Sequence, residues 1–572
     1  MREPFLLFDD ARAGAPPARL YRGPQELVVA RTIKEEPAAL DAVQAAVRGG
    51  AHAAGFLAYE AGIALDPALA SAARQADGPL LWFGLFDGFA EVDAATFLPD
   101  PAGARASPPQ ARIAHDDYLA AAARVREHLF AGDFYQANLT FGCDVRIAGD
   151  PMALYARLRR AGAAGWGGVV RHDGGWLLSA SPEQFFTLRD GVIEARPMKG
   201  TAPPGAPPEA LTGDPKNRAE NLMIVDLLRN DLARVAEPGS VAVPELFTVE
   251  TYPTLRQMVS RVTARLRPGL DAVDVLRTIF PCGSVTGAPK IAAMLRLAEL
   301  EPEPRGFYTG SMGWIDPDGD ASFNVLIRTL AIGRDETAAR LGLGSGLVVD
   351  SDSGDEWAEC LAKGAFVTAQ QRSVDLIETM RFDPHEGVLE LDRHLDRLGS
   401  SAHALGFAYD RHAARNELQA ATFSRKKHGV ARLLLSPTGV MAVELRNLPP
   451  VARPPVPVAV CPMPVSPSDF RLRHKTTDRA FYDRAREEGG AFETLFVDKE
   501  GMLTEGTFTS LFVERDGKLL TPPASRGLLA GVLRAKLLDE GRAVEADLTP
   551  GDLAGGFMVG NMIRGLIPAR LA

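Results

Sequence analysis

The sequence predicts an α+β protein built from two units, one large and one smaller. At 572 residues the chain is too long for a single hydrophobic core, which favours two to four domains. Strand patterns and helix patterns are mixed without the regular alternation of a doubly wound sheet. A break near 370–373 leaves about 370 residues before it and about 200 after it, as a large and a smaller unit require. We expect domains at 1–371, with a less regular N-terminal part at 1–110, and at 373–572.

The composition is typical of a soluble globular protein, with 46% hydrophobic and 24% charged residues. The net charge of −10, from 63 basic and 73 acidic residues, argues against nucleic-acid binding. No apolar run reaches the length of a membrane span, and the first ten residues do not have the pattern of a signal peptide. The four cysteines form no CxxC pair, which favours reduced thiols over disulfides or a zinc site. We therefore expect a cytoplasmic protein that binds neither nucleic acid nor membranes.

Short-range patterns predict most elements. Apolar, aromatic-rich runs predict strands at 55–59 and 80–86, and helical spacing of apolar residues predicts helices at 116–130, 220–235, 291–300 and 356–368. In the first unit we further expect a connection at 100–109, a turn leading into a strand at 132–140, a hairpin of 176–188 with 192–195, a flexible loop at 203–215 and a strand at 342–349. In the second unit we expect a strand at 376–382, a helix at 392–404 and an extended Pro-rich segment at 451–467.

Lys199 lies at the end of a predicted strand. Residues 191–195 alternate between apolar and polar side chains, as a half-buried strand does. Pro197 cannot donate a ladder hydrogen bond, so the strand ends or bulges there, and Gly200 permits a close backbone approach. A lysine held in this way is an ion-pair partner, a solvated charge or a nucleophile, and the local pattern alone does not choose among these.

Glu183, in a Ser-Pro-Glu segment, lies sixteen residues before Lys199. If the two segments form a hairpin, both side chains face one pocket. A carboxylic acid beside an amine provides a proton donor next to a nucleophile. The alternative is a plain ion pair between them.

Three glutamates on two predicted helices are candidate metal ligands. Glu356 and Glu359 are three residues apart and share a helix face, and Glu220 opens the other helix. Magnesium is typically held by a few carboxylates together with substrate oxygens and water. The alternative is that these carboxylates are solvated. Three nearby aspartates, Asp350, Asp352 and Asp355, add negative charge that would suit a cation. They could equally be turn residues.

A Gly-rich loop at 281–290 precedes the helix predicted at 291–300. It lacks the GxxxxGK[ST] order, so it is not a Walker A loop, but free N–H groups before a helix favour an anion site. Arg328 is expected on a buried strand at 324–329. A buried arginine requires an anion, and a substrate carboxylate would meet that need through a bidentate pair.

These motifs, taken in order, resemble the chorismate-utilising enzymes. The set consists of SPE (181–183), RPMKGT (196–201), ENLMIVDLLRND (220–231), PCGSVTGAPK (281–290), GFYTGSMGW (306–314), IRT (327–329) and GSGLVVDSD (344–352), followed by two glutamates and a lysine. The resemblance covers about residues 110–370. The KGT form resembles the aminodeoxychorismate synthase component I family, whereas the related anthranilate synthases carry a small residue where Lys199 stands.

This resemblance implies a large α/β sandwich and Mg²⁺-dependent chemistry on chorismate. Lys199 would attack the ring at C2, Glu183 would protonate the leaving C4 hydroxyl, and ammonia would add at C4 as Lys199 leaves. The implied magnesium ligands are Glu220, Glu356 and Glu359. The implied substrate contacts are Thr286, Gly287, Tyr308, Arg328, Gly344, Ser345 and Gly346. Because no glutaminase with its reactive cysteine is recognised, ammonia would come from a separate glutamine amidotransferase subunit or from solution.

The second unit contains the three parts that pyridoxal phosphate requires. These are a lysine (Lys475), a carboxylate for the pyridinium nitrogen (Glu505) and a helix start for the phosphate (Gly531). Each of these residues alone is weak evidence for the cofactor, since Lys475 could equally be a surface charge and Glu505 could cap a turn. Their order and spacing resemble the class IV aminotransferase fold over about 375–570, a family that includes aminodeoxychorismate lyase. By this resemblance the HxxRL segment at 394–398 supplies Arg397 to the phosphate. Gly531, Val532 and Asn561 match further phosphate contacts.

We therefore predict a bifunctional enzyme that makes 4-aminobenzoate, a folate precursor, from chorismate and ammonia. One alternative joins the synthase to a true aminotransferase, and another keeps the second unit as an inactive docking module. Anthranilate synthase is a weaker alternative that Lys199 argues against, and salicylate or isochorismate synthases rank lower because they use water. Class IV folds often dimerise, so a homodimer through the second unit stays open.

Overall fold

The computed structural model describes residues 3–203, 205–251 and 256–572. Its contacts divide the chain into two compact units, which are described separately below. The first comprises residues 1–99, 108–145 and 155–370, and the second comprises 100–107, 146–154 and 371–572. The segments at 100–107 and 146–154 join the second unit, which the sequence did not lead us to expect. The domain limits 1–371 and 373–572 stay a prediction.

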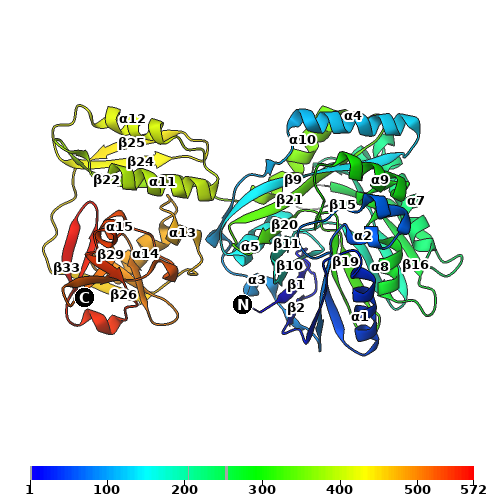
Figure 1. Cartoon of the computed structure of the whole chain (residues 1–572), viewed down its shortest axis with the longest axis horizontal. Coiled ribbons are helices and arrows are strands. Elements are labelled where there is room, and N and C mark those ends of the chain that lie inside the picture. Colours follow the sequence, from blue (N-terminus) through cyan, green and yellow to red (C-terminus); the bar gives the residue numbers. More distant parts are fainter. Residues whose placement is uncertain (1–2, 204, 252–255) are drawn as a thin grey trace. The chain divides into compact units, whose positions relative to one another are not determined.

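A large antiparallel sheet, which we call the eleven-stranded sheet, lies in the first unit except for its residues 104–106 and 146–149, which belong to the second (Figure 1). In pairing order its strands are β17 (Gly287–Ala288), β9 (Gln136–Gly149), β21 (Ala338–Leu347), β20 (Thr329–Gly333), β11 (Gly175–Ser179), β10 (Gly167–His172), β1 (Phe5–Asp9), β2 (Ala18–Arg22) and β6 (Ala90–Val92), while β7 (Ala104–Ala106) and β8 (Gln110–Ala111) pair with β9. Strands far apart in sequence are neighbours here, so its register depends on long-range pairing.

A second antiparallel sheet, the ten-stranded sheet, carries the Lys199 segment. Its order is β14 (Met198–Ala202), β16 (Arg256–Arg265), β13 (Val192–Arg196), β12 (Gln184–Arg189), β19 (Ala321–Asn324), β18 (Ser311–Ile315), β4 (His52–Leu57), β5 (Leu81–Phe86) and β3 (Glu26–Ala30), while β15 (Ala242–Thr251) pairs with β16. The shared core cluster of buried residues contains Leu6 and Val170 from one sheet and Phe56 and Trp82 from the other. The two sheets therefore pack face to face as a sandwich.

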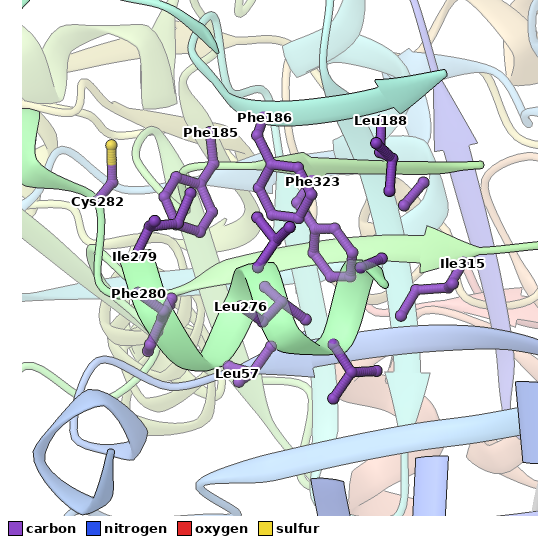
Figure 2. Packing of buried hydrophobic residues seen from close by; sticks show 14 of the residues in the cluster. Leu57, Phe185, Phe186, Leu188, Leu276, Ile279, Phe280, Cys282, Ile315 and Phe323 are labelled. Atoms are coloured by element: carbon purple, nitrogen blue, oxygen red, sulfur yellow. The ribbon is translucent and has the colours of Figure 1, made fainter. Parts of the chain in front are cut away.

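Helices α1, α7 and α8, whose bounds follow, cover the other face of the ten-stranded sheet. The helices within residues 1–370 are α1 (Glu36–Arg48), α2 (Ala61–Ala64), α3 (Ala94–Phe97), α4 (His115–Ala131), α5 (Pro151–Gly162), α6 (Glu209–Thr212), α7 (Pro215–Ala233), α8 (Ala272–Ile279), α9 (Lys290–Leu300) and α10 (Ser353–Gly364). Figure 2 shows Ile279 of α8 next to Phe185, and Leu276 of the same helix toward Phe186 of β12 and Phe323 of β19. The rings of Phe186 and Phe323 stack with centroids 5.3 Å apart. This cluster anchors β12, the strand that Glu183 precedes.

One expected hairpin arm and one expected loop of the first unit differ from the structure. The expected arm 176–188 is two strands, because β11 belongs to the eleven-stranded sheet and β12 to the ten-stranded sheet. Pro182 lacks a ladder donor, and residues 180–183 carry the chain from one sheet to the other. The hairpin that does form joins β12 to β13. The loop expected at 203–215, of which Pro204 lies outside the described residues, contains the short helix α6.

The second unit combines two sheets with helices, and both units together confirm the predicted α+β class. A four-stranded sheet has the order β23 (Gly387–Val388), β22 (Leu376–Asp383), β24 (Gly429–Leu435) and β25 (Met441–Arg446). An eight-stranded sheet has the order β28 (Leu503–Gly506), β27 (Glu493–Val497), β26 (Val456–Pro462), β33 (Gly565–Leu571), β32 (Phe557–Asn561), β29 (Ser510–Arg515), β30 (Lys518–Thr521) and β31 (Ala543–Glu545). Its helices are α11 (Leu391–Leu405), α12 (Arg411–Thr422), α13 (Phe470–Arg473), α14 (Ala480–Gly489) and α15 (Val532–Asp539). Across the described parts of the whole chain, none of the helices combines the length and the apolar character needed to cross a membrane.

Candidate active sites

Lys199 lies on β14, which is at the end of the ten-stranded sheet. It pairs with Met258 of β16, and the register shifts between Lys199 and Thr201. The shift is centred on Gly200, whose φ is +75°. A Cβ at Gly200 would meet the Asn217 side chain of α7 at 3.0 Å. The bulge and this close approach hold Lys199 on a rigid strand, as the sequence indicates.

Glu183 is buried, with 8% of its surface exposed, immediately before β12. Its carboxylate accepts a 2.6 Å hydrogen bond from Ser284 Oγ. Burial raises the pKa of Glu183, while the Ser284 hydrogen bond and the charge of Lys199 oppose the rise. The structure therefore places Glu183 and Lys199 within electrostatic reach of each other, in a setting that favours the protonated acid.

The Lys199 amine lies beside Gly346 of β21. A Cβ at Gly346 would lie 3.7 Å from Lys199 Nζ and 2.3 Å from Gln136 Nε2. Gln136, on β9, is buried, and its Oε1 has no hydrogen-bond partner among the described residues. Lys199 of the ten-stranded sheet therefore lies close to Gln136 and Gly346 of the eleven-stranded sheet. We did not single out Gln136 in the sequence, because it occupies an ordinary strand position.

Gly346→Ala is expected to lower ammonia-dependent turnover of chorismate by about 10- to 100-fold, because the new methyl group displaces Gln136 and crowds Lys199. Chorismate consumption and thermal unfolding would both be measured. The matched control is Gly88→Ala, since a Cβ at Gly88 meets no atom within 4 Å. Equal turnover of the two variants would contradict a functional role for the space that the missing side chain of Gly346 leaves beside Lys199 and Gln136.

The three predicted metal ligands act on one another from two helices. Burial raises the pKa of Glu220, and the charges of Glu356 and Glu359 raise it further, against Lys199 and Lys216. No described residue donates a hydrogen bond to the Glu220 carboxylate. Glu356 accepts from Ser351 Oγ at 2.7 Å, and Glu359 pairs with Lys363 at 2.8 Å. Within residues 3–203, 205–251 and 256–572, no three acidic, His or Cys side chains are gathered closely enough to form a metal site as they stand.

The loop at 281–290, whose role as an anion site stays a prediction, also positions groups of the protein itself. The Thr286 hydroxyl donates to the carbonyl oxygens of Cys282 and Gly283, and Ser284 reaches Glu183. Lys290 is paired with Asp231 at 2.8 Å. A Cβ at Gly287 would meet the Gln136 carbonyl oxygen at 2.5 Å, so this glycine lets the loop pair with β9.

Arg328 does not lie on a strand, which corrects our expectation. It sits between β19 and β20 with φ +50°, because the chain leaves one sheet and enters the other there. Burial lowers the pKa of Arg328, and none of the described residues pairs with its guanidinium. This leaves a cation without a partner, as a carboxylate-binding arginine requires.

The remaining predicted substrate contacts lie along β21. The Tyr308 ring packs on Gly342, where a Cβ would lie 2.0 Å from it, and it lines a cavity of about 670 Å³. The Ser345 hydroxyl faces Tyr118 at 3.3 Å, so the backbone and not this side chain is available to a ligand. Lys363 Nζ donates to the Gly344 carbonyl oxygen at 2.9 Å and acts electrostatically on Glu183. Lys363 is a second residue that we did not select from the sequence.

In the second unit, all six predicted cofactor residues line one cavity of about 500 Å³. They are Arg397, Lys475, Glu505, Gly531, Val532 and Asn561. Lys475 Nζ donates to Thr379 Oγ1 at 3.1 Å. Desolvation, followed by the charge of Arg397, lowers the pKa of Lys475 to about 7. Its amine is therefore substantially neutral near pH 7.

Glu505 is buried and held by two donors. Tyr482 Oη donates to one oxygen at 2.6 Å, and the Leu529 N–H donates to the other at 3.0 Å. Burial nevertheless raises the pKa of Glu505 to about 7. Such a carboxyl can share a proton with a ring nitrogen at neutral pH. Tyr482 is a further site residue that the sequence pattern did not reveal.

The predicted phosphate end of the cavity contains Arg397 and the start of α15. Arg397 makes two hydrogen bonds to Glu378, of 2.8 and 2.7 Å, and a third to the Ala530 carbonyl oxygen. Gly531 caps α15, where a Cβ would meet Ser510 Oγ at 2.8 Å. The Asn561 amide bonds the Phe508 carbonyl oxygen and so holds the opposite wall. The helix start and Arg397 together suit a phosphate group.

Comparison with known proteins identifies the family. The sequence model described as chorismate binding enzyme matches residues 11–369, and the chain therefore belongs to the chorismate binding enzymes. The model described as amino-transferase class IV matches residues 375–572. These matches confirm the predicted pair of folds.

Among the similar proteins are aminodeoxychorismate synthases and anthranilate synthases. Aminodeoxychorismate synthase component 1 of Klebsiella aerogenes is 43% identical over 261 residues, which cover 44% of this chain and 57% of that protein. Anthranilate synthase component 1 of Methanothermobacter thermautotrophicus is 38% identical over 257 residues, covering 44% of this chain and 55% of that protein. A solved anthranilate synthase component I from Streptococcus pneumoniae TIGR4 covers 64% of this chain and 91% of its own, with 24% identity and a TM-score of 0.51, which supports the fold alone. The chain spans about half the length of the curated relatives it matches.

Proposed function

We propose that this chain makes 4-aminobenzoate in two steps. The first unit converts chorismate and ammonia to 4-amino-4-deoxychorismate, and the second unit removes pyruvate from that product. The observation that carries the proposal is the pairing of a buried acid, Glu183, with a lysine on a rigid strand, Lys199. The aminodeoxychorismate synthases among the relatives support the same choice of product.

In the first step, Lys199 Nζ forms a bond to C2 of the chorismate ring. The C4 hydroxyl leaves as water with the proton of Glu183, whose raised pKa keeps that proton available. Ammonia then bonds to C4, the bond from Lys199 to C2 breaks, and the lysine is regenerated. The unpaired guanidinium of Arg328 and the glycine backbone of β21 would hold the substrate carboxylates.

The donor set on α7 and α10 fits a magnesium ion. The charges of Glu356 and Glu359 act on Glu220, whose pKa is raised by burial and whose carboxylate accepts no hydrogen bond from the described residues, and a divalent cation would relieve this repulsion. Glu220, Glu356 and Glu359 would hold it. Bound Mg²⁺ would offset the charge of the ring carboxylate. Glu359 would then exchange its contact with Lys363 for the metal.

In the second step, the cavity residues fit pyridoxal phosphate. A near-neutral lysine, a carboxyl with a pKa near 7 and a helix start surround one space. When bound, the cofactor would supply an electron sink. Lys475 would hold it and then move a ring proton of the substrate. Glu505 would share a proton with the pyridine nitrogen, and Arg397 with the α15 start would orient the phosphate.

Incubation of the purified chain with chorismate, ammonium, Mg²⁺ and pyridoxal phosphate is expected to give 4-aminobenzoate and pyruvate. Products would be separated by chromatography and identified against standards. Anthranilate as the product would overturn the synthase proposal. Aminodeoxychorismate that accumulates without 4-aminobenzoate would overturn the lyase half alone.

The partner and the location belong to the same proposal. Ammonia would come from a separate glutamine amidotransferase subunit, as the name component 1 of the relatives suggests, and the enzyme would work in the cytoplasm. A second candidate activity is amino-group transfer by the second unit, which its match to the class IV aminotransferases favours. Turnover of an amino acid with a 2-oxo acid, without pyruvate release from aminodeoxychorismate, would support that alternative.

A further inference from the structure

One buried nitrogen in the second unit has no role in the chemistry proposed so far. His394, on α11, has 1% of its surface exposed and lines the 500 Å³ cavity. Its Nδ1 lies 2.6 Å from the Glu378 carboxylate. Its Nε2 is buried and has no hydrogen-bond partner among the described residues. An unpartnered buried polar atom at a cavity wall indicates a missing ligand atom.

The charges around His394 show what that ligand atom must be. Arg397, one turn further along α11, also faces the cavity, but its guanidinium is joined to Glu378 by two hydrogen bonds. The carboxylate and the guanidinium cancel in net charge. The same cavity is also lined by Lys475 and by several arginines, and the α15 start adds a partial positive charge; these arginines are Arg432, Arg446, Arg479, Arg486 and Arg564. Protonation of His394 would place a further positive charge at Nε2 itself, which has no partner among the described residues.

The hydrogen on Nδ1 also follows from this arrangement. Arg397 and His394 hold the pKa of Glu378 far below its usual range, so that carboxylate is ionised and accepts the Nδ1 hydrogen. Neutral His394 then presents a lone pair at Nε2, which repels a phosphate oxygen. Imidazolium would instead donate from both nitrogens, to Glu378 on one side and to the phosphate on the other.

We propose that His394 is a phosphate-binding residue that takes up a proton when the 5′-phosphate of pyridoxal phosphate enters the cavity. This inference rests on the proposed function of the second unit. The charged groups acting on His394 are Glu378 of β22, Arg397 of its own helix and Lys475, with Arg432 of β24 acting on Lys475. In the free protein, burial together with Arg397 and Lys475 lowers the pKa of His394, so it is neutral at pH 7.5. A dianion at Nε2 would raise that pKa.

The test is calorimetric titration of the full chain with pyridoxal phosphate at pH 7.5, in two buffers that differ in ionisation enthalpy. The wild-type chain is expected to take up about one proton more per bound cofactor than His394→Gln does. His394→Gln is also expected to bind the cofactor about 10- to 100-fold more weakly, the range for loss of a charge-assisted hydrogen bond. The matched control is His403→Gln, an exposed histidine on the same helix, which should behave as wild type.

A second measurement does not depend on any variant. Affinity of the wild-type chain for inorganic phosphate should fall by about tenfold per pH unit as pH rises from 7.5 toward the raised pKa of His394, and should level off above that pKa. The ³¹P resonance of the bound cofactor should stay at the dianion position. Equal proton uptake by wild type and His394→Gln, or a monoanion resonance, would overturn the inference and leave the proposed function standing. A wild-type chain that binds no pyridoxal phosphate would overturn both.

Discussion

Lys199→Ala is expected to abolish most ammonia-dependent conversion of chorismate, with a loss of about 10³-fold or more, as befits removal of a covalent nucleophile. Alanine keeps the β14 backbone and removes the amine that lies beside Gly346 and acts on Glu183. The measurement is the initial rate of chorismate consumption with saturating ammonium and Mg²⁺. Supplied aminodeoxychorismate should still yield 4-aminobenzoate, because the second unit keeps its site.

The matched control for this substitution is Lys34→Ala, an exposed lysine of the same unit. It should consume chorismate at the wild-type rate. If Lys199→Ala retained that rate as well, Lys199 would form no bond to the substrate and the ion-pair alternative would hold. Mass spectrometry of the protein quenched during turnover gives an independent readout, since only a covalent role adds substrate mass at Lys199.

Lys475→Ala is expected to stop the reaction at aminodeoxychorismate, with loss of 4-aminobenzoate formation of about 10³-fold or more. The substitution removes the amine whose pKa is lowered to about 7 and which contacts Thr379. Chorismate should be consumed at the wild-type rate while the intermediate accumulates. The visible absorbance of lysine-bound pyridoxal phosphate should also be absent.

Lys518→Ala is the matched control for the second unit, since this lysine is exposed on β30. Its absorbance and product ratio should equal those of wild type. Normal 4-aminobenzoate formation by Lys475→Ala would show that the cavity lysine takes no part in the second step.

The sequence pattern predicted the helices and strands that are determined by residues close together in the chain. Helix α11 was expected at 392–404 and runs from Leu391 to Leu405, because its apolar spacing is regular. The expected hairpin arm at 176–188 was wrong because it consists of two strands in different sheets. The sheet that a strand joins depends on distant pairing partners, which the local alternation of apolar and polar residues does not reveal. The same limit explains Arg328, where an apolar run resembles a strand but the chain turns between the sheets.

The residues of the two candidate sites divide in the same way, into those that a local sequence pattern predicts and those that only the fold reveals. Lys199 was predicted because a proline ends or bulges its strand, and Glu183 because it lies sixteen residues before Lys199. Lys475 and Glu505 were predicted because they belong to a spaced set of motifs. Ser284 could not be found, since its hydrogen bond to Glu183 spans 101 residues and serine is common in loops. His394 stood inside a motif, yet only its unpartnered Nε2 sets it apart, and that requires side-chain positions.

The position of the first site at the meeting edge of two sheets has a kinetic consequence. Lys199 and Glu183 come from the ten-stranded sheet, whereas Gln136 and Gly346 come from the eleven-stranded sheet. The geometry around Lys199 therefore depends on how the two sheets pack against each other. Under the proposed function, a change in either sheet that shifts this packing should alter the turnover of chorismate.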